Sequence, residues 1–489
     1  MKLLPFLILL ASAASLQARP VSFAPANSVL GQAGFGGETV FNPPTASSLN
    51  APEGLAIDPT SGKLFVADSE NHRILRFSSA DAYRTNAVAE AVFGQPDFES
   101  NEPNRGEMNP AVNSLDFPTA LAIDGQGRLW AADSGNRRVL RFDNASIKPK
   151  FGATADGVLG QAGFAAKGGF PDFDVDSPQR AVFSDPMGVA VDGAGRLWVS
   201  DSGLSRVLRF DSPASLGTSF DGDADGYLGR FEDGDFVADA GASAFGGAVS
   251  GLSVSPDGTL WVADASNNRV LRFDDAANKP DGADADGVLG QPDFDAFDFE
   301  ETSATSLSQP YYVTAAPNGT LWISDYNNNR VVGHLNAASK ANGAAANIVL
   351  GQPNFVSSST GIPANRATPS PTQVAVGFQG SLFVGQYDEA GRVRRWSDPV
   401  SIFARRVVRA NRAGVAVVRG RAAGATLVQF RVPRQGGFRR VRGSAAVWNA
   451  RVARLASRVT PVRFRAVAFD GRSVQTVVRI RRPMPRRRR

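Results

Sequence analysis

Residues 188–210, GVAVDGAGRLWVSDSGLSRVLRF, decide the fold because versions of this stretch recur six times along the chain. The stretch contains three short apolar runs, at residues 189–191, 197–199 and 207–210, each typical of a β-strand. Turn-forming residues such as Asp192-Gly193 separate the runs. The sequence therefore predicts a repeat array and not one globular core.

A shorter phrase, VLGQ or a close variant, alternates with the long one and supplies a fourth strand. Its six copies begin at Val29, Val92, Val158, Tyr227, Val288 and Val349. An Asp at the end of the second strand marks the period, with successive spacings of 65, 68, 63 and 61 residues for Asp68, Asp133, Asp201, Asp264 and Asp325. Four strands at such a period predict one propeller blade per repeat.

The order of the phrases indicates how the ring closes. The first VLGQ precedes any three-strand set, whereas the last set, residues 374–396, has no VLGQ after it. Residues 27–35 are therefore expected to add as the outer strand of the sixth blade, which removes the open edges of an unclosed sheet. We predict an all-β fold, with a six-bladed propeller over residues 27–397 closed by its N-terminal strand.

The repeats resemble the NHL family of propellers through the segment Asn71-His72-Arg73-Ile74-Leu75. The resemblance extends to an Asp followed five positions later by an Arg, in the pairs Asp68/Arg73, Asp133/Arg138, Asp201/Arg206, Asp264/Arg269 and Asp325/Arg330. Because the pair recurs in blade after blade, we interpret it as a structural brace of the loop between the second and third strands. The sixth blade departs from the pattern, with Gln386 for the Asp and Arg392 one position late.

The first 19 residues have the layout of a secretory signal, and export together with this repeat style resembles bacterial proteins. Lys2 precedes an apolar run, and small residues lead to Gln17-Ala18-Arg19. We therefore expect a secreted protein, periplasmic or extracellular, without a transmembrane span. The chain has no cysteine, so no disulfide contributes to its fold.

Charge divides the chain near residue 398. Residues 401–489 contain 24 Arg and one acid, about +23, which leaves 28 basic and 46 acidic residues, about −18, before them. Alternating runs such as residues 462–466 predict short strands, and residues 401–480 resemble the immunoglobulin-like or fibronectin-like β-sandwiches appended to secreted proteins. Residues 481–489 are expected to form an Arg-rich tail.

The basic module has three possible binding partners. Anionic envelope polymers or lipid head groups fit the compartment, through contacts that weaken with salt. Docking on the acidic propeller is the alternative, and nucleic acid is disfavoured because the strands lack an RNP-type aromatic motif.

Asp221, Asp223, Asp225 and Glu232 match the spacing of carboxylates in an EF-hand calcium loop. Strands and not helices are expected to flank this loop, so a solvated acidic turn is the alternative to a Ca²⁺ site.

Enzymatic relatives of six-bladed propellers include amidating lyases, gluconolactonase-like hydrolases and paraoxonase-like lactonases. The two histidines, His72 and His334, are too few for a conventional zinc site, and we interpret both as surface or packing residues. A calcium-dependent lactonase needs acids on the inner strands, but residues 54–57, 120–123 and 188–191 offer none.

Long loops between the fourth strand of one blade and the first strand of the next remain as a binding surface. Two of them mix aromatic and acidic residues, and from these we select Phe173, Asp174, Phe297, Asp298 and Phe299. The same residues could instead pack one loop on another. We predict a non-enzymatic scaffold that binds protein or carbohydrate without a cofactor; the alternative is a calcium-dependent hydrolase, lactonase or lyase at the channel.

Overall fold

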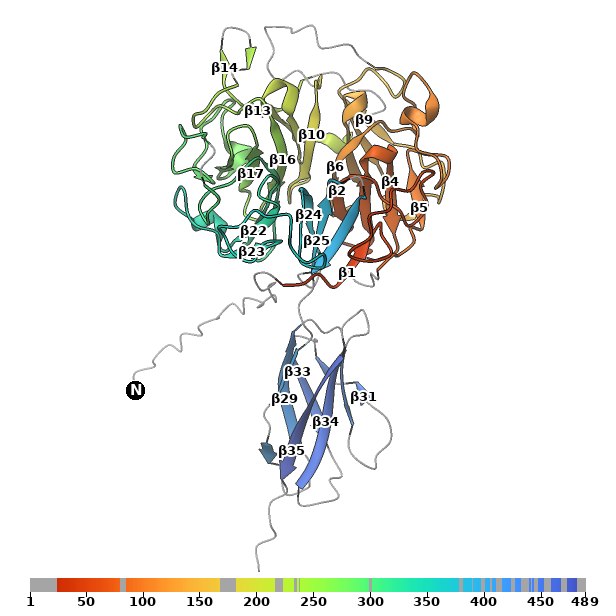
Figure 1. Ribbon diagram of the computed structural model, residues 1–489, viewed down its shortest axis with the longest axis vertical. Coiled ribbons are helices and arrows are strands. Elements are labelled where there is room, and N and C mark those ends of the chain that lie inside the picture. Colours follow the sequence, from red (N-terminus) through yellow and green to blue (C-terminus); the bar gives the residue numbers. More distant parts are fainter. Residues whose placement is uncertain are drawn as a thin grey trace, which may run out of the picture.

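The computed structural model describes residues 24–396 apart from 80–84, 168–181, 216–222, 233–234, 237, 299–300, 378–380 and 389. In residues 401–481 it describes the strands. Figure 1 shows the first of these parts as a ring, with the inner strands β2, β6, β10, β16 and β24 gathered in its middle.

Six antiparallel four-stranded sheets form the blades, as the period predicts. We call the strands of a blade a to d from the channel outward. Blades one to three comprise β2 Pro52–Ile57, β3 Leu64–Asp68, β4 Arg73–Phe77 and β5 Ala91–Phe93; β6 Pro118–Ile123, β7 Leu129–Asp133, β8 Arg138–Phe142 and β9 Gly157–Leu159; and β10 Pro186–Val191, β11 Leu197–Asp201, β12 Arg206–Phe210 and β13 Gly226–Leu228. Blades four to six comprise β16 Val249–Val254, β17 Leu260–Asp264, β18 Arg269–Phe273 and β19 Gly287–Leu289; β20 Pro310–Ala315, β21 Leu321–Asp325, β22 Arg330–His334 and β23 Ile348–Leu350; and β24 Pro371–Val376, β25 Leu382–Gln386, β26 Arg392–Trp396 and β1 Ser28–Leu30.

The N-terminal strand closes the ring, which confirms the prediction drawn from the order of the phrases. β1 pairs antiparallel with β26, with Val29 opposite Arg394. Val29 and Leu30 are fully buried. The indole of Trp396 donates to the carbonyl of Ala24 at 2.9 Å, so the two ends of the propeller are joined by a sheet and by a side chain.

The hydrophobic core lies between neighbouring blades. Trp130 of blade two packs with Val189 and Val199 of blade three, and Trp198 of blade three packs with Leu252 and Val262 of blade four. Burial of such a side chain stabilises the fold by about 1.5–3 kcal/mol relative to its exposed state. Each second strand therefore supplies a large side chain to the next blade, and the ring is held together around its circumference.

Every inner strand carries a register shift where it starts, next to its Pro or Val. Such a bulge re-aims side chains that regular alternation would place elsewhere. Inter-blade hydrogen bonds fix this layer, for example from Thr119 Oγ1 to Pro186 O at 3.2 Å and from Thr372 Oγ1 to Pro52 O at 2.8 Å. The bulges therefore set which residues line the channel entrance.

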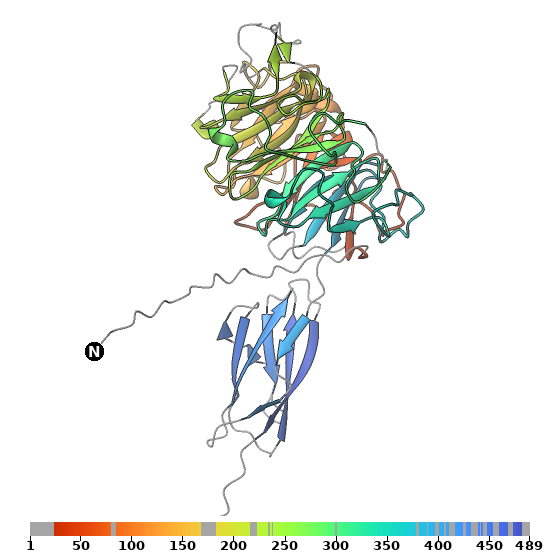
Figure 2. The same ribbon diagram turned by 90° about the vertical axis from the view of Figure 1, so that its left-hand side faces the viewer.

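A short hairpin of β14 Phe231–Glu232 and β15 Asp235–Phe236 follows blade three. It projects from the ring in both views (Figures 1 and 2). Among the described residues, no helix has the length and apolar character needed to span a membrane.

Residues 401–481 contain strands in two separate sheets. One is β27 Ser401–Ala404, β29 Ala416–Ala423, β33 Val447–Val452 and β32 Arg442–Gly443; the other is β28 Val407–Arg409, β35 Ser473–Arg481, β34 Val459–Val467, β30 Leu427–Arg431 and β31 Arg439–Arg440. The packing of these sheets as a β-sandwich stays a prediction. Residues 1–19 lie outside the described residues, as does the predicted tail apart from Arg481.

Candidate functional site

The loop between strands b and c begins and ends at a buried ion pair. In blade one, Arg73 Nε donates to Asp68 Oδ2 at 2.7 Å, and neither side chain is exposed. Asn71 Nδ2 donates to the same carboxylate oxygen at 2.9 Å, and Arg73 Nη2 donates to the carbonyl of Ser48 at 3.1 Å. One guanidinium thus ties its own b–c loop to the incoming d–a loop.

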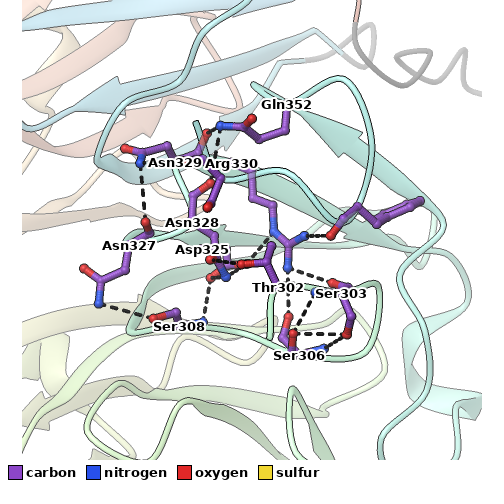
Figure 3. Close-up of polar contacts among 12 residues, drawn as sticks. Thr302, Ser303, Ser306, Ser308, Asp325, Asn327, Asn328, Asn329, Arg330 and Gln352 are labelled. Atoms are coloured by element: carbon purple, nitrogen blue, oxygen red, sulfur yellow. Dashed lines mark hydrogen bonds and ion pairs between the residues drawn. The ribbon is translucent and has the colours of Figure 1, made fainter. Parts of the chain in front are cut away.

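The ion pair and the guanidinium bond to the d–a loop recur in the other four pairs, and the Asn recurs in all of them except blade three, where Leu204 stands in its place. In blade five, Arg330 Nε donates to Asp325 Oδ2 at 2.6 Å and Arg330 Nη2 donates to Ser306 O at 2.9 Å (Figure 3). The Nε to Oδ2 distance is 2.7 Å for Arg138/Asp133 and Arg269/Asp264, and 3.4 Å for Arg206/Asp201.

The glutamine of VLGQ holds the long loops on this face. Gln95 Nε2 donates to Glu102 O at 2.8 Å and to His72 O at 3.2 Å, so one amide bridges the d–a loop and the b–c loop. Gln352 makes the equivalent bonds to Ser359 O at 2.8 Å and to Asn329 O at 3.1 Å. Both loop types therefore lie at the same end of the ring.

In blade six, two arginines together make the hydrogen bonds that a single arginine makes in the other blades. Arg394 Nε donates to Gln386 Oε1 at 2.7 Å, and Arg394 Nη1 donates to Ala364 O. Arg392 Nη1 donates to Phe35 O at 3.1 Å, the bond that Arg73 makes to Phe98 O elsewhere in the ring. Sequence reasoning recognised Arg392 alone, since Arg394 lies outside the spacing of the other five pairs.

A buried carboxyl stands at the channel mouth on this face. Glu53 lies in the bulge of β2 and is 1% exposed, and the Tyr311 hydroxyl from the bulge of β20 donates to Glu53 Oε2 at 2.6 Å. The pKa of Glu53 is raised to about 8, mainly by burial; the Tyr311 hydrogen bond opposes this, and the charges of Asp185 and Glu70 add smaller upward contributions. The expectation that the inner strands offer no acid was wrong, because Glu53 directly precedes the residues on which it rested.

Tyrosines from blades five and six surround this carboxyl. The rings of Tyr311 and Tyr326 lie 5.5 Å apart between centroids, tilted by 38°. The Tyr387 hydroxyl donates to Glu70 Oε1 at 3.3 Å, in the 3-10 helix η1 Ser69–Asn71. Burial raises the pKa of Tyr387 to about 12, with the Glu70 charge as the next cause.

The other four blades have smaller side chains where blades five and six have Tyr326 and Tyr387. At the position of Tyr326 and Tyr387, directly after strand b, the other four blades have Ser69, Ser134, Ser202 and Ala265. Ser134 Oγ donates to Asp185 Oδ1 at 2.5 Å, which fixes a second carboxylate at the entrance. The mouth is thus asymmetric, because blades five and six carry a tyrosine at this position and the other four blades carry serine or alanine.

Side chains from opposite blades meet below the mouth. Gln373 of blade six accepts from Leu55 N at 2.7 Å and donates to Leu121 O at 3.3 Å, which joins blades six, one and two. Tyr312 of blade five is 2% exposed and packs in one cluster with Ala120 and Val189 of blades two and three. These contacts join inner strands on different sides of the ring below Glu53, and we call them the floor of the mouth.

Comparison with known proteins is consistent with this geometry. The NHL repeat model matches residues 49–77 and 249–273. The ring is a six-bladed NHL-repeat propeller. Curated relatives include Protein SUPPRESSOR OF QUENCHING 1, chloroplastic, from Arabidopsis thaliana, 21% identical over 58% of this chain and 25% of that protein, and NHL repeat-containing protein 2 from Homo sapiens, 25% identical over 58% of this chain and 39% of that protein. The chain thus matches well under half the length of either relative.

Two solved structures are similar to this chain at low identity and low TM-score. A streptogramin B lyase covers 71% of this chain and 94% of its own, at 12% identity and a TM-score of 0.40. A gluconolactonase from Xanthomonas campestris covers 77% of this chain and 98% of its own, at 16% identity and a TM-score of 0.39.

The aromatic and acidic loop residues chosen from the sequence lie partly within the described residues. Phe297 is 54% exposed, and its carbonyl accepts from Asn268 Nδ2 at 3.0 Å. Asp298 is exposed, and its carbonyl accepts from Gln291 Nε2 at 2.9 Å. Both therefore lie beside the b–c loop of blade four; Phe173, Asp174 and Phe299 lie outside the described residues.

Strand β13 lies within the predicted calcium loop and separates its first three carboxylates from Glu232. Asp225 precedes that strand and accepts from Asp211 N at 2.7 Å, the bond that Asp286 makes to Asp274 N in blade four. Glu232 follows the strand and pairs with Arg230 Nε at 3.5 Å. Asp223 is exposed, Asp221 lies outside the described residues, and no group of three metal-ligating side chains occurs within the part of the chain described.

The two histidines hold structural positions. His72 Nδ1 accepts from Phe117 N at 3.0 Å, which joins blades one and two. His334 is 2% exposed and pairs with Leu321 in the register where other blades place an aromatic side chain, such as Phe77 or Phe273. Burial lowers the pKa of His334 to about 3, so it packs as a neutral side chain.

Proposed function

We propose that this protein is an exported, non-enzymatic interaction scaffold that binds protein or carbohydrate through the face formed by its b–c and d–a loops. The observation on which the proposal depends is the asymmetric mouth at the centre of that face, with Glu53 and Tyr311 at its base. Aromatic side chains beside polar groups are frequent at the centres of binding interfaces. A rigid ring presents them with little loss of conformational entropy on binding.

The rim of the same face supports this proposal. The braces and the VLGQ glutamines hold the backbone of the long loops, whereas side chains such as Phe297 stay exposed. A loop whose backbone is fixed by hydrogen bonds and whose side chains are exposed to solvent is the arrangement expected of a recognition loop on a scaffold.

The basic segment at residues 401–489 supplies a second contact in this proposal. Its charge of about +23 favours anionic envelope polymers or lipid head groups, or else the propeller itself, which carries about −18. Binding to an external anion would fall as salt rises, because exposed charges are screened beyond about 10 Å at 0.1 M salt.

The test compares matched variants of the full mature chain for retention on cell-envelope fractions and on glycan and protein panels. We expect Phe297→Ser, and a double Tyr326→Ser and Tyr387→Ser variant, to weaken binding at least tenfold. Ile147→Ser is the control, because Ile147 is 80% exposed in a c–d loop at the opposite end of the ring. Equal losses in all three variants, or none, would reject the loop face as the binding surface.

A lyase or hydrolase at the channel, calcium-dependent or not, is the second candidate. Glu53 favours it, since a buried carboxyl with a raised pKa is the kind of group that donates protons at catalytic sites. Turnover of lactone or ester substrates that is lost in Glu53→Gln would favour the enzyme over the scaffold. Parallel assays with and without a calcium chelator would show whether the metal takes part.

A further inference from the structure

We propose that a pocket between blades four and five binds a small neutral molecule, a ring of benzene size that carries one hydroxyl or carbonyl group. The pocket lies among the a–b turns of these two blades and the 3-10 helix η8 Ala337–Ser339, in the c–d loop of blade five. This end of the ring is opposite the face formed by the b–c and d–a loops. Binding there is therefore separate from the proposed function, and either can fail without the other.

The size and the lining of the pocket set the class of ligand. Its volume is about 220 Å³. An engineered apolar cavity of about 150 Å³ holds benzene, so this pocket has room for one six-membered ring with a substituent. Four alanines line it together with Trp261, Pro256, Pro317 and Leu321. Asp257, which is exposed to solvent, is the only charged residue among the described residues that line it, and this disfavours an anionic ligand.

The pocket exists because side chains that fill the same junction elsewhere in the ring are replaced here. Between blades one and two, Lys63 Nζ donates to Ser146 O at 2.8 Å, in the 3-10 helix η4 Ala145–Ile147. At the junction of blades four and five, Thr259 has the place of Lys63 directly before strand b, and Ala338 has the place of Ser146. Thr259 is too short to span the junction and Ala338 has no hydroxyl, so the space between the turn and the helix stays open.

A buried hydroxyl without a partner belongs to the wall of this pocket. Thr320 lines the pocket and is 1% exposed, and its Oγ1 has no hydrogen-bond partner among the described residues. The other buried donor of the wall is satisfied, since Trp261 Nε1 donates to Ser255 Oγ at 2.9 Å. An unpaired buried hydroxyl is costly, and it can donate to a ligand carbonyl or accept from a ligand hydroxyl.

Comparison of the six blades shows that this unpaired hydroxyl is an exception. Thr259 is the counterpart of Thr320 in blade four, and its Oγ1 donates to Asp274 Oδ1 at 3.5 Å. Leu335 has the place of Asp274 in blade five, so Thr320 has lost that acceptor. The side chain at this position is paired in the other described blades, with Glu90 for Lys63, Asp124 for Arg128, Asp192 for Arg196 and Arg395 for Ser381.

The experiment is a fluorine-19 NMR titration of the full mature chain labelled with 5-fluorotryptophan, because Trp261 borders the pocket. The probes are phenol, toluene and benzylammonium, which share a ring and differ in the polar group. Phenol and toluene should shift the Trp261 signal, assigned with Trp261→Phe, with dissociation constants of about 1–10 mM. The signals of Trp130 and Trp198, at the same position in blades two and three, should not move. No shift of the Trp261 signal with either compound, or tighter binding of benzylammonium than of phenol, would overturn the proposal.

The polar contact is tested with Thr320→Val, which removes the unpaired hydroxyl at nearly constant volume. It should weaken the binding of phenol about three- to tenfold and leave that of toluene unchanged. Phenol binding that is equal in this variant and in the original chain would overturn the assignment of a hydroxyl or carbonyl ligand.

The location is tested at Ala338, an exposed residue of the lining. Ala338→Leu should fill the pocket and weaken both compounds by about tenfold or more. Ala277→Leu is the matched control, at the same position of the 3-10 helix η7 Ala276–Asn278 in blade four, and should change neither. Unaltered binding in Ala338→Leu would exclude this pocket as the site. Envelope or glycan binding that depends on Phe297 would in that case leave the scaffold proposal standing.

Discussion

The Tyr311 hydroxyl donates to Glu53 Oε2 at 2.6 Å and so joins the inner strands of blades five and one, which are separated by blade six. The contact exists because both side chains sit in β-bulges, where the register of the inner strand shifts. It places a buried carboxyl with a raised pKa at the end of the channel where the b–c and d–a loops lie.

The buried Glu53 should make the stability of the protein depend on pH. Its folded pKa of about 8 lies above the ordinary glutamate value of about 4.3, so its contribution to stability is complete below about pH 4.3 and is lost as pH rises toward 8. Across that window the free energy of unfolding should fall by at most about 1.4 kcal/mol per pH unit. Glu53→Gln should give a flatter profile in chemical denaturation at pH 5, 6, 7 and 8; parallel profiles for the two proteins would contradict the assignment.

The braces of blades five and six should respond in opposite directions to a change of charge. Asp325→Asn leaves buried Arg330 without its counterion and should cost about 3–5 kcal/mol. Gln386→Glu places a carboxylate beside Arg394 and removes an amide nitrogen, Gln386 Nε2, that has no partner among the described residues. It should be neutral or stabilising by about 1 kcal/mol. Denaturant midpoints of the two variants would show this contrast, and a large loss in Gln386→Glu would refute the equivalence of the two braces.

The floor of the mouth should not tolerate a side chain at Gly251. A Cβ at this position would lie 2.3 Å from Tyr312 Cγ. Gly251→Ala should therefore destabilise the fold by about 1–3 kcal/mol through overpacking. Gly247→Ala is the matched control, since nothing lies within 4 Å of its Cβ. Thermal unfolding of both variants measures the difference, and equal melting temperatures would argue against a packed floor.

Closure by β1 should make Val29 far more sensitive than its exposed neighbour Val40. Val29 is fully buried against β26, whereas Val40 is 52% exposed. Val29→Asp should lose about 3–5 kcal/mol and favour aggregation through the uncovered edge of β26, while Val40→Asp should change stability by about 0.5 kcal/mol or less. Denaturation and light scattering would test this, and a stable, monomeric Val29→Asp protein would contradict closure through β1.

Most of the ring could be predicted from the sequence because its signals repeat. Apolar alternation and turn residues return in every period and the Asp/Arg pairs in five of the six, so chance matches are averaged out. Val29 could be assigned to blade six because a missing strand at one end and a spare strand at the other leave one way to close the ring.

The mouth could not be predicted because its residues are those that break the repeat. Glu53 precedes the residues taken as the inner strand, and the bulge, which alternation does not reveal, turns it toward the channel. Tyr326 and Tyr387 replace the Ser or Ala found at the same position in the other blades. A comparison of the six repeats for positions where one blade differs would have found both tyrosines. Arg394 was not predicted because in blade six the hydrogen bonds of the brace are shared between two arginines, Arg392 and Arg394.

The central claim is that the inner strands of blades one and five hold a buried carboxyl, Glu53, against the Tyr311 hydroxyl. A carbon-13 NMR titration of glutamate-labelled protein, with Glu53→Gln to assign the signal, measures this directly. The account predicts a midpoint for Glu53 at about pH 8. A midpoint near the ordinary value of about 4.3 would contradict it, because it would mean that the carboxyl is solvated or already paired with a cation.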